Sequence, residues 1–154
     1  MRSVNDWFGG YSADHQNATN RLIHWVCVPA ILWAAVAALW LIPVPAMIGR
    51  PGFWCGLAMV AAIAFYWRLS HALGIAMFIV FVVLGASSEA LYRSLGPSHL
   101  LGLAIVVFVL AWIGQFVGHL IEGRRPSFLT DLSYLLIGPA WLTGKIMRRI
   151  GIAN

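Results

Sequence analysis

Three histidines and a glutamate stand out in this sequence because imidazole and carboxylate groups can together hold a transition metal. They are His15, His24, His119 and Glu122. Because His119 and Glu122 are three residues apart, they share one face of a helix and reach a common centre. His15 and His24 are nine apart, which is half a turn out of phase on a helix. Both can bind one metal only if the chain before His24 folds back.

The two polar stretches that contain these histidines, 15–24 and 114–119, are suited to shaping such a site. The first holds Asn17 and Asn20, whose side chains can support a bend or orient an imidazole through its second nitrogen. The second places Gln115 one turn before its histidine, on the same helical face. It also holds two glycines four residues apart, which permit the close approach of another helix.

The chain that must position these residues has the composition of a membrane protein. Its 154 residues are 61% hydrophobic and 10% charged, whereas soluble domains carry about 25% charged residues. As a helix, about 20 apolar residues cross a bilayer core. We therefore expect one all-α integral membrane domain over residues 1–154, a bundle of about four transmembrane helices, with Thr19 or Asn20 as the N-cap of the first. The apolar runs that predict the spans are residues 22–42, 53–69, 72–92 and 100–121.

A shorter segment at each end completes the predicted fold. Apolar side chains at positions 4, 7, 8 and 11 lie on one helical face, which predicts an interfacial helix over residues 1–12 that Gly9 and Gly10 would end. Residues 132–147 hold a modest apolar run that is broken at Gly138–Pro139. Such a run is too short for a further span, so it predicts a re-entrant or interfacial segment.

The net charge of +5 comes from basic residues at the ends of the apolar runs. No basic face with interleaved aromatic residues is present, so nucleic acid is not an expected partner. Cations in these places suit anionic lipid headgroups. With the N-terminus inside, eight basic residues face inward and two outward, which predicts a bacterial inner-membrane protein with its N-terminus and site on the cytoplasmic side. The inner group is Arg2, Arg21, Arg68, Arg124, Arg125, Lys145, Arg148 and Arg149, and the outer group is Arg50 and Arg93.

Four antiparallel spans would return the end of the fourth helix to the face where the first begins. The three histidines and Glu122 then meet at one face, with His71 on the same side and His99 on the other. Ionisable groups that gather at membrane depth favour a metal site over simple contact with headgroup water. For His71 and His99 we expect only such contact.

Two histidines and a carboxylate suit a non-haem Fe(II) oxygenase, while His24 and His119 on separate helices also suit a bis-imidazole haem electron carrier. A lipid-binding protein without enzymatic activity is the third possibility.

Two segments resemble the signature motifs of the 2-hydroxy fatty acid dioxygenase family, membrane enzymes of fatty acid α-oxidation. They are HQNATNRLIHWVCVP at 15–29 and WIGQFVGHLIEGRRPSF at 112–128. The segment DLSYLLIGPAWL at 131–142 is similar to bacterial members. The resemblance covers both ends of the chain, whereas the middle spans match mainly in hydropathy. It implies a multi-span membrane protein that uses Fe(II), histidines and O₂ to shorten a 2-hydroxy fatty acid by one carbon.

The resemblance also carries individual residues across by position. The motif histidines correspond to His15, His24 and His119, which are thereby implied as iron ligands. Asn17, Asn20, Gln115 and Gly118 match motif positions as well. Two residues separate His119 from Glu122, where the fungal pattern has three, so Glu122 is expected either to complete the set of ligands or to act beside it. We further expect Arg124 or Arg125 to bind the substrate carboxylate, or else to serve as positive-inside anchors.

Overall fold

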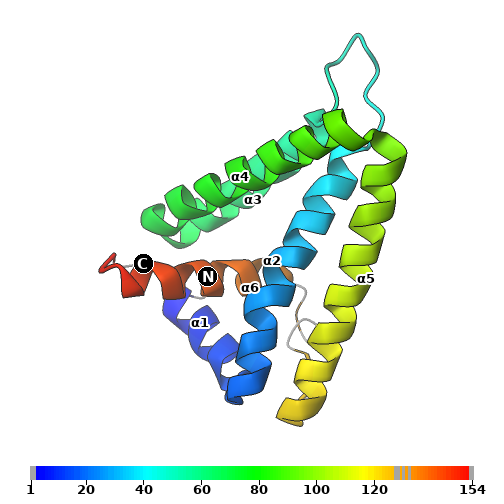
Figure 1. The fold of residues 1–154 in the computed structure, drawn as a ribbon. Helices are drawn as coiled ribbons and strands as arrows, with labels where there is room; N and C mark the ends of the chain where they lie inside the picture. Colours follow the sequence, from blue (N-terminus) through cyan, green and yellow to red (C-terminus); the bar gives the residue numbers. More distant parts are fainter. Residues whose placement is uncertain (1–2, 127–128, 130, 132, 153–154) are drawn as a thin grey trace.

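The computed structural model describes residues 3–126, 129, 131 and 133–152. Arg2, assigned above to the inner side of the membrane, lies outside these described residues. Within them the chain forms α-helices and connecting segments without any β-strand, which confirms the predicted all-α class. Figure 1 shows the helices α1 (Val4–Ala13), α2 (Ala18–Trp40), α3 (Phe53–Leu69), α4 (His71–Leu95), α5 (Pro97–Glu122) and α6 (Tyr134–Arg149).

Three of these helices are long and apolar enough to cross a membrane: α2, α4 and α5. They correspond to the first, third and fourth predicted spans. The second predicted span coincides with α3 residue for residue, but α3 is a shorter apolar helix of 17 residues. The sequence thus located all four apolar helices, and a membrane-spanning role for α3 stays a prediction.

The long helices form two antiparallel pairs that splay apart (Figure 1). α2 packs against α5, and α3 packs against α4, which leans away from the first pair. α6 crosses α2 in the angle between the pairs and also contacts α4, and α1 packs on α6. The arrangement is therefore less regular than the bundle expected from the sequence, because two short helices fill the wedge between the long ones.

The C-terminal helix α6 is continuous, although its sequence predicted a break at Gly138–Pro139. Pro139 lacks an N–H and so cannot bond the carbonyl of residue 135, but the surrounding packing holds the helix together. Ile137 and Trp141 are among the largest fully buried side chains of the protein. The Tyr66 hydroxyl on α3 donates a hydrogen bond to the Leu136 carbonyl at 2.8 Å. Burial among other helices outweighs the local helix-breaking tendency.

The N-terminal helix α1 likewise runs past Gly9 and Gly10, which were expected to end it. A capping box between Ser3 and Asp6 begins the helix, and its apolar face is buried against α6. The Trp7 and Tyr134 rings meet edge to face at 5.2 Å. Gly10 serves this contact, because a Cβ there would lie 2.8 Å from the Tyr134 hydroxyl oxygen. The glycine permits close packing rather than ending the helix.

Candidate metal centre

The turn between α1 and α2 folds the chain back between the first two histidines. Its last residue, Asn17, is the N-cap of α2, in place of the predicted Thr19 or Asn20. The Asn17 Oδ1 atom accepts hydrogen bonds from the backbone N–H groups of Thr19 at 2.8 Å and Asn20 at 3.3 Å. The helix consequently begins at Ala18, four residues before the predicted span, and the turn ahead of it carries His15 back toward His24.

His15 and His24 are both buried, at 2% and 1% exposure. The His15 Nδ1 atom lies 2.6 Å from the Tyr11 carbonyl oxygen, and the His24 Nδ1 atom lies 2.9 Å from the Asn20 carbonyl oxygen. A carbonyl oxygen can only accept a hydrogen bond, so in each ring Nδ1 carries the hydrogen. Each neutral ring then presents the lone pair of its Nε2 atom.

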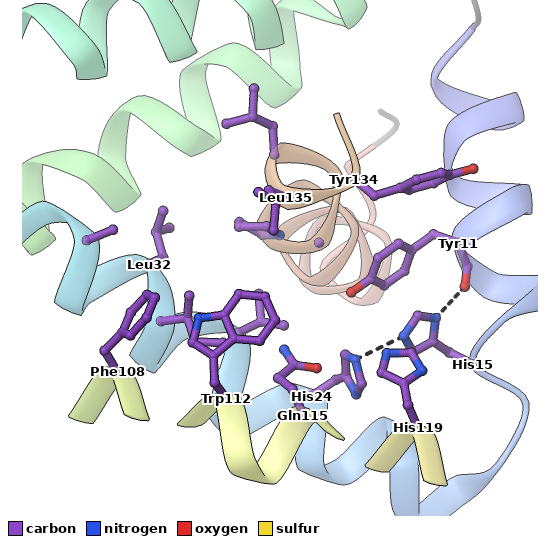
Figure 2. A pocket seen from close by; sticks show the side chains of 16 residues that line it. Tyr11, His15, His24, Leu32, Phe108, Trp112, Gln115, His119, Tyr134 and Leu135 are labelled. Carbon is purple, nitrogen blue, oxygen red and sulfur yellow. Dashed lines mark hydrogen bonds between the residues drawn. The ribbon is translucent and has the colours of Figure 1, made fainter. Parts of the chain in front are cut away.

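These two Nε2 atoms face each other at 3.0 Å (Figure 2). Two lone pairs at this separation repel unless a proton or a metal ion lies between them. Two imidazole nitrogens about 2.0–2.1 Å from a shared metal are about 2.9–3.4 Å apart at octahedral or tetrahedral angles. Burial lowers the pKa of His15 below its usual value, which keeps that ring in the neutral form that a metal requires. The pair therefore has both the separation and the protonation state of metal ligands.

His119 completes a group of three at the end of α5. Its ring centroid lies 5.1 Å from that of His15 and 5.0 Å from that of His24. One ligand atom from each of the three histidines lies within 4.8 Å of the other two. The His119 Nδ1 atom is buried and has no hydrogen-bond partner among the described residues. A buried nitrogen without a partner beside two facing lone pairs fits the coordination of a metal ion.

The Glu122 carboxylate lies beside this group and holds the turn that carries His15. It accepts hydrogen bonds from the backbone N–H of Gln16 at 2.8 Å and of Asn17 at 2.9 Å. It also accepts one from the Asn20 side-chain amide at 2.9 Å. The group of three that could hold a metal does not include Glu122. Of the two roles expected from the sequence, this arrangement favours the supporting one.

Close approach of α2 and α5 makes these contacts possible. A Cβ at Gly118 would overlap the Asn20 side-chain oxygen, and one at Gly114 would lie 2.6 Å from the Cys27 sulfur. The two glycines thus form the small-residue contact expected from their spacing. Asn20 is fully buried by this contact, and its backbone carbonyl is the one that orients His24.

An apolar cavity of about 330 Å³ opens from the three histidines. Gln115 lines it one turn before His119, as its position predicted, and the Tyr11 ring stacks on His15 with centroids 4.1 Å apart. Burial raises the pKa of the Tyr11 phenol, so that group stays protonated. Figure 2 shows Tyr11, Gln115 and the histidines at one side of the cavity, and Leu32 and Phe108 at the other.

The two candidate carboxylate-binding arginines lie beside His119 but do not line this cavity. Arg124 and Arg125, together with His119, line a second hollow of about 460 Å³. Arg124 also forms an ion pair with Asp14, with Nη1 and Oδ1 3.3 Å apart. That pair fastens the end of α5 to the residue directly before His15.

His71 and His99 are exposed and are not among the three histidines that lie close enough together to share a metal ion. The sequence did not single out Tyr11 as a residue of the site. Its position in the apolar stripe of α1 predicted burial, but not contact with His15. The four-residue spacing between Tyr11 and His15 is the signal that could have indicated it.

Comparison with known proteins gives this site a context. The family described as 2-hydroxy-palmitic acid dioxygenase Mpo1-like matches residues 1–150. The chain is 28% identical over 150 residues to the 2-hydroxy-palmitic acid dioxygenase MPO1 of Saccharomyces cerevisiae, an alignment that covers 93% of this chain and 79% of the yeast protein. No solved structure is significantly similar to this chain.

Proposed function

The chain belongs to the 2-hydroxy-palmitic acid dioxygenase Mpo1-like family, and from this premise we propose that it is an Fe(II)-dependent dioxygenase that shortens 2-hydroxy fatty acids by one carbon with O₂. The observation that carries the proposal is the convergence of three buried histidines. Two of them, His15 and His24, present their Nε2 lone pairs to each other at 3.0 Å. The proposed ligands are His15, His24 and His119.

The donor set fits iron in its chemistry. Three neutral imidazoles without a thiolate suit Fe, Zn or Mn, and a reaction with O₂ favours a redox-active ion among these. Bound here, Fe(II) would supply the redox chemistry that lets O₂ react with an organic substrate and a Lewis-acid centre for the polar end of that substrate.

The protein's own groups would bind and orient the substrate. The apolar cavity beside the histidines suits an acyl tail, because no polar group of the tail must be desolvated. Gln115 lines the cavity near His119 and would offer its amide to the 2-hydroxyl. Arg124 or Arg125, in the hollow that shares His119, would bind the carboxylate. Tyr11 and Glu122 would keep His15 and His24 in place through the stacked ring and the fastened turn.

The geometry gives no support to the haem alternative. On opposite faces of a haem, two imidazoles have ligand nitrogens about 4 Å apart, and the rings extend away on either side. The His24 and His119 ring centroids are only 5.0 Å apart, and the Nε2 atoms of His15 and His24 are closer still. These separations favour a single metal ion over a flat macrocycle between the rings.

We also propose a cytoplasmic location for the site in a bacterial inner membrane. The pKa of the Lys145 amine is lowered to about 8, first by burial and then by the nearby positive charges of Arg21, Arg148 and Arg149. Lys145 of this basic cluster also lies near enough to His15 for its charge to act on that ring. Basic residues collect on the cytoplasmic side of membrane proteins.

Anaerobic purification, metal analysis and assay with 2-hydroxy-palmitic acid and O₂ test the proposal. The expected result is about one iron bound per group of three histidines, O₂ consumption, and a fatty acid product shorter by one carbon. His119→Ala should lose iron and turnover, while His99→Ala, which removes an exposed histidine, should keep both. A His119→Ala protein with full iron and turnover contradicts the ligand assignment. Wild-type protein without a transition metal supports the lipid-binding alternative.

A further inference from the structure

The cavity beside the histidines follows one face of each of two helices. On α2 its lining includes His24, Val28, Ile31 and Ala35, and on α5 it includes residues 119, 115, 112 and 108. Steps of three or four residues keep these side chains on one helical face. At 1.5 Å per residue, the eleven residues from His24 to Ala35 span about 16 Å along α2. The cavity is therefore an elongated channel with histidines at one end.

The two ends of this channel differ in polarity and exposure. His24 and His119 are 1% and 5% exposed, whereas Phe108, which lines its other end, is 42% exposed. Among the described residues, no Asp, Glu, Lys or Arg lines the channel. Its open end is thus apolar, and the polar end is the buried one.

The open end lies where lipid, rather than water, is expected. Phe108 lies near the middle of α5, one of the helices apolar enough to cross a membrane. Neighbouring side chains on that helix, including Val109 and Ile105, are also apolar and half-exposed. An apolar opening on a lipid-facing helix gives no path from water. A ligand dissolved in the membrane can enter the channel there directly.

We infer that the opening beside Ala35 and Phe108 is a lateral portal to the bilayer. An acyl chain of the substrate lies in the channel with its polar end at the histidines, and the end of a long tail passes through the portal into lipid. This inference rests on the proposed function for the identity of the ligand. It adds the route of access, and it assigns these two residues as the ones that contact the far end of the tail.

Two matched substitutions on α2 test the portal. Ala35→Phe would fill the opening, while Ala38→Phe would add the same ring to an exposed position on the same helix that does not line the channel. In lipid nanodiscs, Ala35→Phe should lower kcat/KM for 2-hydroxypalmitic acid by about tenfold or more, because overpacking excludes the long tail. 2-Hydroxyoctanoic acid, whose tail ends before the portal, should be affected less than about twofold. Ala38→Phe should leave both substrates unchanged. Equal effects of Ala35→Phe on the two acids overturn the inference.

Photocross-linking provides a readout that does not depend on turnover. A 2-hydroxypalmitic acid with a diazirine at its tail end is added anaerobically to the wild-type protein, and labelled peptides are identified by mass spectrometry. Labelling of the α2 and α5 peptides that contain Ala35 and Phe108 supports the portal even if turnover is absent, in which case only the proposed function fails. Labelling confined to α3, or uniform over all lipid-facing helices, overturns the portal even if the enzyme is active.

Discussion

The Nε2 atoms of His15 and His24 lie 3.0 Å apart, although each ring has already committed its Nδ1 hydrogen to a backbone carbonyl. The carbonyls of Tyr11 and Asn20 therefore determine how the two rings meet. Without a cation between them the facing lone pairs destabilise the fold. With one, the same arrangement becomes a preformed pair of ligands that requires no reorganisation.

Metal should consequently stabilise the folded protein. At a free Fe(II) concentration of one hundred times Kd, the free energy of unfolding should rise by about 2.7 kcal/mol. Anaerobic thermal unfolding of the wild type in detergent, with and without added Fe(II), measures this as a higher Tm. The increase should disappear in His24→Ala and persist in His99→Ala. A metal-dependent increase of equal size in all three proteins would place the metal elsewhere.

Glu122→Gln should weaken metal binding without abolishing it. The carboxylate accepts hydrogen bonds from Gln16, Asn17 and Asn20, so it positions the ligands indirectly, and loss of such support costs about 10–100-fold in metal affinity. Competition with a chelator measures the change in Kd, and metal analysis at saturation measures the stoichiometry. The stoichiometry should match that of the wild type. Its loss at saturating metal would instead show that Glu122 is itself a ligand.

Gly118→Ala should disrupt the contact between α2 and α5. The added Cβ would overlap the Asn20 side-chain oxygen, and overpacking of this kind costs about 1–3 kcal/mol of stability. Gly102→Ala is a matched control on the same helix, because nothing lies within 4 Å of its added Cβ and alanine is the better helix former. Tm and iron content should both fall for the first variant only. Equal Tm values for the two variants would count against the close packing.

The sequence predicted the fold well where a long apolar run determines it. The limits of α3 agree with the predicted span, and the return of α5 to the start of α2 brought the three histidines together as expected. Local signals failed at Gly9–Gly10 and Gly138–Pro139, because burial of Tyr11 and Trp141 against neighbouring helices outweighs the helix-breaking tendency of glycine and proline.

The details of the site depend on backbone geometry that no residue spacing contains. The turn from Asp14 to Asn17 directs its N–H groups at Glu122, which favours the supporting one of the two roles that the sequence left open for that carboxylate. The His15 ring also stacks on Tyr11, whose backbone carbonyl binds its Nδ1 atom. Spacing can indicate which residues meet at one end of two helices, but the hydrogen bonds of a loop determine which of them face the centre.

Tyr11 provides a final test of how the site is supported. Its ring stacks on His15 with an angle of 14° between the planes, and its backbone carbonyl accepts the His15 hydrogen bond. Tyr11→Phe keeps the ring and the carbonyl, so iron affinity and Tm should remain close to those of the wild type. Tyr11→Ala keeps only the carbonyl and leaves a cavity against His15 and Trp141, so stability should fall by about 3–5 kcal/mol, as for other large aromatic truncations. Iron affinity should fall with it, because the His15 ring can then rotate about its remaining hydrogen bond. Chelator competition on the two variants separates the contribution of the ring from that of the hydroxyl. If Tyr11→Phe lost as much iron affinity as Tyr11→Ala, the hydroxyl and not the ring would support the centre.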